Sequence, residues 1–132
     1  MKTYYTGQTA SFTKTIAESD VYLFAGITGD MNPVHINAEH ASGTRFKGRI
    51  AHGILSAGLI SNVLGTQLPG PGCVYLGQTL KFVAPVFIGD TITAKVTIQS
   101  IDTEKRRAIL LTECKNNKNE IVITGEAKVL LP

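Results

Sequence analysis

The sequence has few cysteines and no long apolar run, and each absence excludes a class of protein. Cys73 and Cys114 are the only cysteines among 132 residues, and they do not form a CxxC pair. Their scarcity excludes a disulfide-rich scaffold and a zinc site built from cysteines, and it fits a reducing compartment. No apolar run approaches the roughly 20 residues that a transmembrane helix requires, and residues 1–15 lack the apolar core of a signal peptide. We therefore expect a cytoplasmic protein with no membrane partner.

The sequence also lacks a strong excess of charge of either sign. Thirteen basic and ten acidic residues give a net charge of +3, which suits an anionic small ligand as well as a nucleic acid. The basic run at residues 105–107 has no aromatic residues interleaved with it for base stacking, so we expect a solvated turn and no nucleic-acid partner. Hydrophobic residues make up 43% of the chain, which is enough for an ordinary core. The length predicts one domain over residues 1–132.

The last third of the sequence alternates between apolar and polar residues, which is typical of half-buried strands. The clearest run covers residues 91–99, and further runs cover 106–115 and 120–130. In the last of these, the face expected to be buried consists of Ile121, Ile123, Ala127 and Val129. Polar turns separate the three runs and predict an antiparallel meander. Runs at 74–83 and 3–13 are expected to extend the same sheet.

One segment departs from this strand pattern. Residues 51–65 have the length of a helix and contain no Asp, Glu, Lys or Arg. A helix without a charged face is a buried one, and the small residues of this segment would allow a sheet to approach closely. A shorter helix is expected over residues 16–27, ending at Gly29. The sequence therefore predicts an α+β fold in which a sheet curls around one central helix.

The residues most able to do chemistry lie between Thr28 and His35. Pro33 prevents a straight helix from passing through, and Gly29 can reverse the chain at positive φ. Asp30 and His35 are therefore expected to converge at a bend, where a carboxylate and an imidazole can remove a proton from one water. The same composition is typical of an ordinary turn followed by a histidine that binds a backbone carbonyl. Spacing alone does not decide between these interpretations.

A second candidate site is the start of the uncharged helix. A helix N-terminus presents unpaired N–H groups that can hold an anion, and Gly53 has no side chain to keep a carbonyl oxygen away. Close packing explains Gly53 equally well, and His52 also fits a hydrogen-bonded core histidine. The histidines at 35, 40 and 52 do not have the spacing of metal ligands with nearby cysteines or carboxylates, so we expect no metal.

A family resemblance extends these interpretations. Residues 24–35 (FAGITGDMNPVH), followed by Ala41, closely resemble the hydratase-2 motif of the (R)-specific enoyl-CoA hydratases, which belong to the MaoC-like dehydratases. The resemblance continues through residues 51–53, 74–82 and 85–91. It implies the hot-dog fold, an α+β architecture in which a curved antiparallel sheet wraps around a central buried helix, and it implies a homodimer.

The resemblance also implies roles for individual residues. Asp30 and His35 would be the catalytic pair, and the Gly53 N–H would hold the thioester oxygen in an oxyanion hole. Asn32 would orient the bend, and Ser61 would lie near the active site. The implied reaction is reversible, (R)-specific hydration of trans-2-enoyl-CoA to (R)-3-hydroxyacyl-CoA by syn addition of water. The substrate would be an acyl-CoA thioester, and no cofactor besides its own CoA would be needed.

Other functions stay open on the sequence. A hot-dog acyl-CoA thioesterase would also hold an acyl carbonyl at a helix N-terminus. A non-catalytic acyl-CoA-binding module would keep the fold without the chemistry, although the presence of both Asp30 and His35 disfavours it. A small basic nucleic-acid binder is disfavoured because the chain has no aromatic platform.

Overall fold

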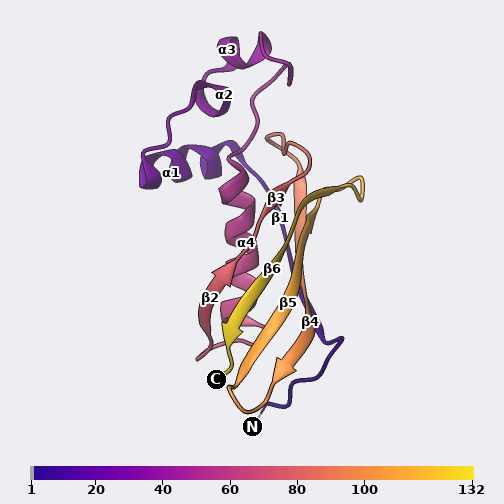
Figure 1. The fold of residues 1–132 in the computed structure, drawn as a ribbon. Helices are drawn as coiled ribbons and strands as arrows, with labels where there is room; N and C mark the ends of the chain where they lie inside the picture. Colours follow the sequence, from indigo (N-terminus) through magenta and orange to yellow (C-terminus); the bar gives the residue numbers. More distant parts are fainter. Residues whose placement is uncertain (1) are drawn as a thin grey trace.

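A long helix lies along an antiparallel sheet in the computed structural model, which describes residues 2–132 (Figure 1). The helices are α1 (Glu18–Thr28), α2 (Pro33–Ile36), α3 (Ala38–Ser42) and α4 (Gly53–Thr66). The strands are β1 (Thr9–Thr15), β2 (Val74–Gln78), β3 (Lys81–Phe82), β4 (Thr91–Asp102), β5 (Arg107–Lys115) and β6 (Ile121–Leu130). The strand order is β1-β4-β5-β6-β2, and β3 also pairs with β6. Figure 1 shows α1, α2 and α3 gathered beyond the end of the sheet where α4 begins.

Strands β4, β5 and β6 form the antiparallel meander that the alternating sequence predicts. Along β4, every second residue from Ile92 to Ile98 is buried. The polar turns form as expected: the Asp102 carboxylate accepts a hydrogen bond from the Lys105 N–H (3.0 Å), and the Asn116 side chain accepts one from the Lys118 N–H (2.9 Å). Burial of one face of each strand thus sets the pairing, and side-chain hydrogen bonds close the turns.

The predicted buried face of β6 is wrong at its first position. Ile121 is 39% exposed, whereas Val122 is fully buried. Cys114 pairs with Ile123 and Lys115 pairs with Ile121, so Val122 is an additional residue with no partner of its own on β5. Such a β-bulge inverts the alternation on one side of it. The other three residues of the predicted face are buried.

The remaining strands are either shorter than the sequence predicts or shifted along the chain from the predicted positions. The expected run over 74–83 is divided into β2 and β3, with a register shift between Tyr75 and Gly77. The expected run over 3–13 becomes β1, which pairs with β4 from Thr9 to Thr15. Strand β1 flanks the meander next to β4, and β2 and β3 flank it next to β6, which completes the sheet.

Helix α4 packs one face on the sheet and leaves the other uncovered. Its buried residues are Ser56, Ile60, Val63 and Leu64. The apolar residues among these share one core cluster with buried residues of β4, β5 and β6. Ile54 and Ser61 lie on the exposed face. The predicted central helix and surrounding sheet are confirmed, but complete burial of the helix is wrong for a single chain.

Helix α1 corresponds to the shorter helix expected over residues 16–27. Its first turn is fixed by the Asp20 carboxylate, which accepts a hydrogen bond from the Ala17 N–H (2.8 Å) and pairs with Lys14 (3.0 Å).

Within residues 2–132, none of the helices combines the length and the apolar content needed to span a bilayer.

Candidate active site

The bend predicted between Thr28 and His35 is present. Helix α1 ends at Gly29, which has a φ of 79°, a value that favours glycine. The Asp30 carboxylate then accepts a hydrogen bond from the Asn32 N–H (3.2 Å), and the Asn32 side chain accepts one from the Val34 N–H (3.2 Å). Pro33 begins α2, where its missing N–H costs nothing. Each residue type therefore fits its place in the bend, and Asn32 caps the helix that carries His35.

His35 is buried and points one ring nitrogen at the backbone. Its Nδ1 lies 2.7 Å from the carbonyl oxygen of Ile50. A carbonyl oxygen only accepts hydrogen bonds, so Nδ1 carries the proton and Nε2 keeps its lone pair. Burial lowers the pKa of His35 from its ordinary value; the Ile50 hydrogen bond opposes this, His52 adds to it and Asp30 opposes it. The imidazole thus stays available as a base at a lower pH than a free histidine does.

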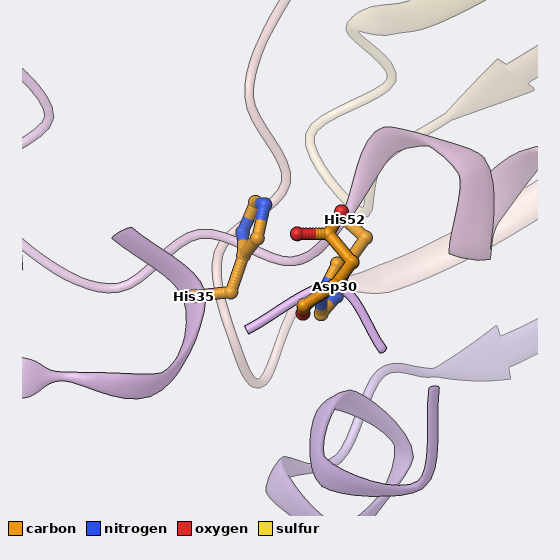
Figure 2. A group of neighbouring side chains, drawn as sticks. All are labelled: Asp30, His35 and His52. Carbon is orange, nitrogen blue, oxygen red and sulfur yellow. The ribbon is translucent and has the colours of Figure 1, made fainter. Parts of the chain in front are cut away.

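The structure brings Asp30 and His35 together, and it adds a third group. The ligand atoms of Asp30, His35 and His52 all lie within 4.8 Å of one another. Figure 2 shows the three side chains gathered in one place. The Asp30 side chain is exposed in the single chain, whereas both histidines are buried. The convergence predicted from the bend is therefore present in the folded chain.

His52 is a buried, hydrogen-bonded histidine, which is the interpretation that the sequence offered, but its partner belongs to the candidate site. It is 2% exposed, and its Nε2 lies 2.9 Å from the backbone carbonyl oxygen of Asp30. The ring stacks on His35, with centroids 3.9 Å apart and planes at 31°. The ring of Phe24 also packs against His52, with ring centroids 4.7 Å apart. Sequence reasoning left its role open because only the fold brings residues 30 and 52 together.

Arg49 is a contributor that the sequence analysis missed. Its Nε donates to the carbonyl oxygen of His35 (2.7 Å), and its guanidinium pairs with Glu18 on α1 at 2.5 Å. The next residue, Ile50, donates its N–H to the Val34 carbonyl (3.2 Å). The segment 49–52 therefore holds the bend through four hydrogen bonds within the described chain. The available signal in the sequence was a basic residue two positions before residues 51–53, which carry part of the family resemblance.

Gly53 begins α4 beside this group. A Cβ at position 53 would lie 2.6 Å from the ring of Phe82, closer than real contacts allow. Any larger residue at position 53 would have to displace the Phe82 ring, which is 52% exposed, so close packing favours glycine here, as one interpretation proposed. Gly53 and His35 both line a cavity of about 370 Å³. The walls are mainly apolar, and Arg45 stands among the lining residues.

Ser61 does not belong to this group in the single chain. It lies two turns beyond Gly53, about 12 Å along the helix axis at 1.5 Å per residue. It is exposed, and it does not line the cavity next to His35. Its place near the active site stays a prediction.

The three gathered side chains are of residue types that can bind a metal ion, and the absence of a metal stays a prediction. His52 already donates Nε2–H to a backbone carbonyl. The arrangement also presents a carboxylate and the free Nε2 of His35 to one small volume, where they can move a proton.

Most of the chain, residues 3–120, matches the family described as MaoC like domain. The chain belongs to the MaoC-like family. It is 56% identical to the (R)-specific enoyl-CoA hydratase of Rhodospirillum rubrum, over 96% of this chain and 87% of that protein. It is 52% identical to the 3-hydroxybutyryl-CoA dehydratase of Methylorubrum extorquens, over 96% of this chain and 80% of that protein.

The solved structures agree with this MaoC-like membership. The (R)-hydratase from A. caviae involved in PHA biosynthesis matches with a TM-score of 0.96 at 40% identity, covering 100% of both chains. The predicted hot-dog fold is confirmed, and so is the recognition of a MaoC-like chain of the (R)-specific enoyl-CoA hydratase type. The prediction of an enzyme of the hydro-lyase class is confirmed at the level of these relatives.

Proposed function

We propose that this chain catalyses reversible, (R)-specific hydration of trans-2-enoyl-CoA to (R)-3-hydroxyacyl-CoA. The observation that carries the proposal is the convergence of Asp30 and His35 beside an apolar cavity next to the start of α4. An acyl thioester needs an apolar channel for its chain and a polar end for its carbonyl. The named activities of the two bacterial relatives support the same reaction.

In the proposed mechanism, one water lies between the Asp30 carboxylate and Nε2 of His35. Nε2 has the free lone pair because Nδ1–H is held by the Ile50 carbonyl. It accepts a proton from the water while the carboxylate orients it, and the hydroxide forms a bond to C3. The electron pair of the double bond moves toward the thioester carbonyl and gives an enolate. The proton on Nε2 then passes to C2 on the same face, so addition is syn.

The Gly53 N–H is proposed to hold the thioester oxygen as negative charge develops there. It stands at the first turn of α4, where backbone N–H groups point outward and the helix dipole favours an anion. The backbone is already in place, so no reorganisation is needed at the moment of reaction. Removing one donor of this kind typically lowers the rate about 10² to 10³-fold.

We also propose a homodimer. Strand β2 is an edge strand of the sheet, and its apolar residues Val74, Tyr75 and Leu76 are exposed. One whole face of α4 is also exposed, and it carries no charged residue. An exposed apolar edge and an uncharged helix face are typical of surfaces that a second copy covers. Sedimentation equilibrium tests this: a mass near twice 14.2 kDa is expected, and a monomer would contradict it.

A cytoplasmic location forms part of the proposal. Among residues 2–132, Cys73 and Cys114 are both free thiols, as expected in a reducing compartment. Burial raises the pKa of Cys114 to about 12, so that thiol is unreactive. Cell fractionation of the tagged protein tests the location.

The reaction is tested with purified protein and crotonyl-CoA. Hydration is expected to remove the absorbance of the conjugated double bond without releasing a free thiol. The product is expected to be the (R) enantiomer when analysed on a chiral column. Release of thiol would identify a thioesterase, and tight binding without turnover would identify an acyl-CoA-binding module. Comparing crotonyl-CoA with the same acyl group on an acyl carrier protein identifies the carrier.

A further inference from the structure

Within residues 2–132, the side chain of His52 makes one hydrogen bond, and its partner is Asp30, which carries the proposed catalytic carboxylate. Its Nε2–H donates to the Asp30 carbonyl (2.9 Å). Its Nδ1 is buried and pairs with no group of residues 2–132. Buried histidines usually satisfy both nitrogens. The hydrogen bonding of this ring is therefore directed at the backbone of Asp30 alone.

The flat face of the same ring supports His35. The two imidazoles stack at 3.9 Å with an angle of 31° between their planes. On another side, the ring of Phe24 packs against His52 at 4.7 Å and 51°. His35 is otherwise fixed at Nδ1 by Ile50, so stacking on His52 restrains rotation about that hydrogen bond. One side chain thus restrains both members of the Asp30–His35 pair.

We propose that His52 is a positioning residue that aligns Asp30 and His35 for proton transfer. It holds the Asp30 backbone from one edge and the His35 ring from one face, and in the proposed reaction it transfers no proton itself. Since it directly precedes Gly53, it also ties the alignment of the pair to the start of α4. This inference rests on the proposed hydratase reaction, and its expected signature is a loss in kcat with little change in KM.

A matched pair of variants tests the hydrogen bond. His52→Met removes the donor, and His52→Gln restores an N–H donor on a side chain of the same length. We expect His52→Met to lower kcat about 10²-fold, the scale of a small misplacement of catalytic groups. KM should change by less than about 3-fold, because substrate contacts persist. His52→Gln should recover at least about 10-fold of the lost kcat, because its N–H can again donate to the Asp30 carbonyl; at metal sites, loss of a supporting hydrogen bond costs about 10 to 100-fold.

His40→Gln serves as the control, because His40 is an exposed histidine on α3 and should leave both constants unchanged. The inference is overturned if His52→Gln is as impaired as His52→Met, or if the loss appears in KM instead of kcat. A general loosening of the fold would lower the melting temperature of both variants without separating their kcat values.

The tautomer of His52 in the unaltered protein gives a second test that does not depend on the variants folding. Long-range nitrogen–proton NMR spectra are expected to show the proton of His52 on Nε2, in slow exchange with solvent. A proton on Nδ1 would overturn the inference. If the unaltered protein turns over no enoyl thioester, the proposed function fails, and the NMR result still decides whether His52 holds the Asp30 backbone.

Discussion

The meander and the bend before α2 are stabilised in different ways. In β4, β5 and β6, many apolar side chains share one core cluster, so each contact is one of a large number. In the bend, segments 30–35 and 49–52 are joined by four individual hydrogen bonds and one pair of stacked rings. Each of these contacts fixes the direction of one group.

This difference separates stability from chemistry. Burial of apolar area in the sheet supplies free energy of folding, roughly in proportion to the area removed from water. Contacts in the bend set angles and distances, on which proton transfer depends steeply. Substitutions in the bend should therefore act on rates, and substitutions in the meander should act on the free energy of unfolding.

The largest expected effect is that of Asp30→Asn. The amide cannot serve as a carboxylate, so hydration of crotonyl-CoA should slow by about 10² to 10⁴-fold, the range for general acid–base groups. The melting temperature should stay unchanged, because Asp30 is exposed. Asp102→Asn makes the same change of charge at the last residue of β4 and should leave kcat unaltered. Near-normal turnover of folded Asp30→Asn would contradict the proposed mechanism.

His35→Ala should slow the reaction to a similar degree, and the double variant tests whether the pair acts as a unit. Adding Asp30→Asn to His35→Ala should cost less than about 10-fold more, because groups that act together give non-additive losses. Steady-state kcat/KM for the four proteins measures the coupling. Losses that multiply would mean that the two side chains do separate jobs.

In the meander, Leu110→Ala and Leu111→Ala should differ in the free energy of unfolding and not in the rate of the reaction. Leu110 is fully buried, whereas its neighbour Leu111 is 46% exposed. Leu110→Ala should lower the free energy of unfolding by about 2–5 kcal/mol, and Leu111→Ala should change it by less than about 0.5 kcal/mol. Denaturant titration measures both, and kcat of the folded proteins should match that of the unaltered enzyme. Equal destabilisation would mean that the alternation of β5 is misassigned.

The smallest expected effect is a displacement of the acid limb of the pH profile. Burial lowers the pKa of His35, and the unprotonated imidazole is the proposed base. Activity should therefore persist below the ordinary histidine pKa of about 6.5 and fall as pH drops through the lowered value. The unfolded chain takes up this proton first, so stability should also decrease as pH falls below about 6.5. A kcat/KM limb at or above about 6.5 would contradict the assignment.

The sequence predicts what depends on neighbours along the chain. The alternation over 91–99 predicts β4, and the order of Gly29, Asp30, Pro33 and His35 predicts the bend, because turn chemistry is local. The bulge at Val122 escapes prediction, since one additional residue leaves a run that still reads as β-branched and apolar.

Contacts between distant segments are also beyond local patterns. Arg49 and His52 act on residues 14 and 22 positions earlier, and only the fold brings them there. The uncharged helix was correctly placed at the centre. Its exposed face could not be distinguished from a buried one, because both faces lack charge.

Segment 49–52 supports the bend, and the residue after it starts α4. The distance from the imidazole base to the Gly53 amide is consequently set within a few consecutive residues, upstream of almost the whole helix. From α4, only Gly53 and Ile54 line the cavity beside His35. Substitutions beyond the first turn of the helix should therefore leave the spacing of the two groups unchanged.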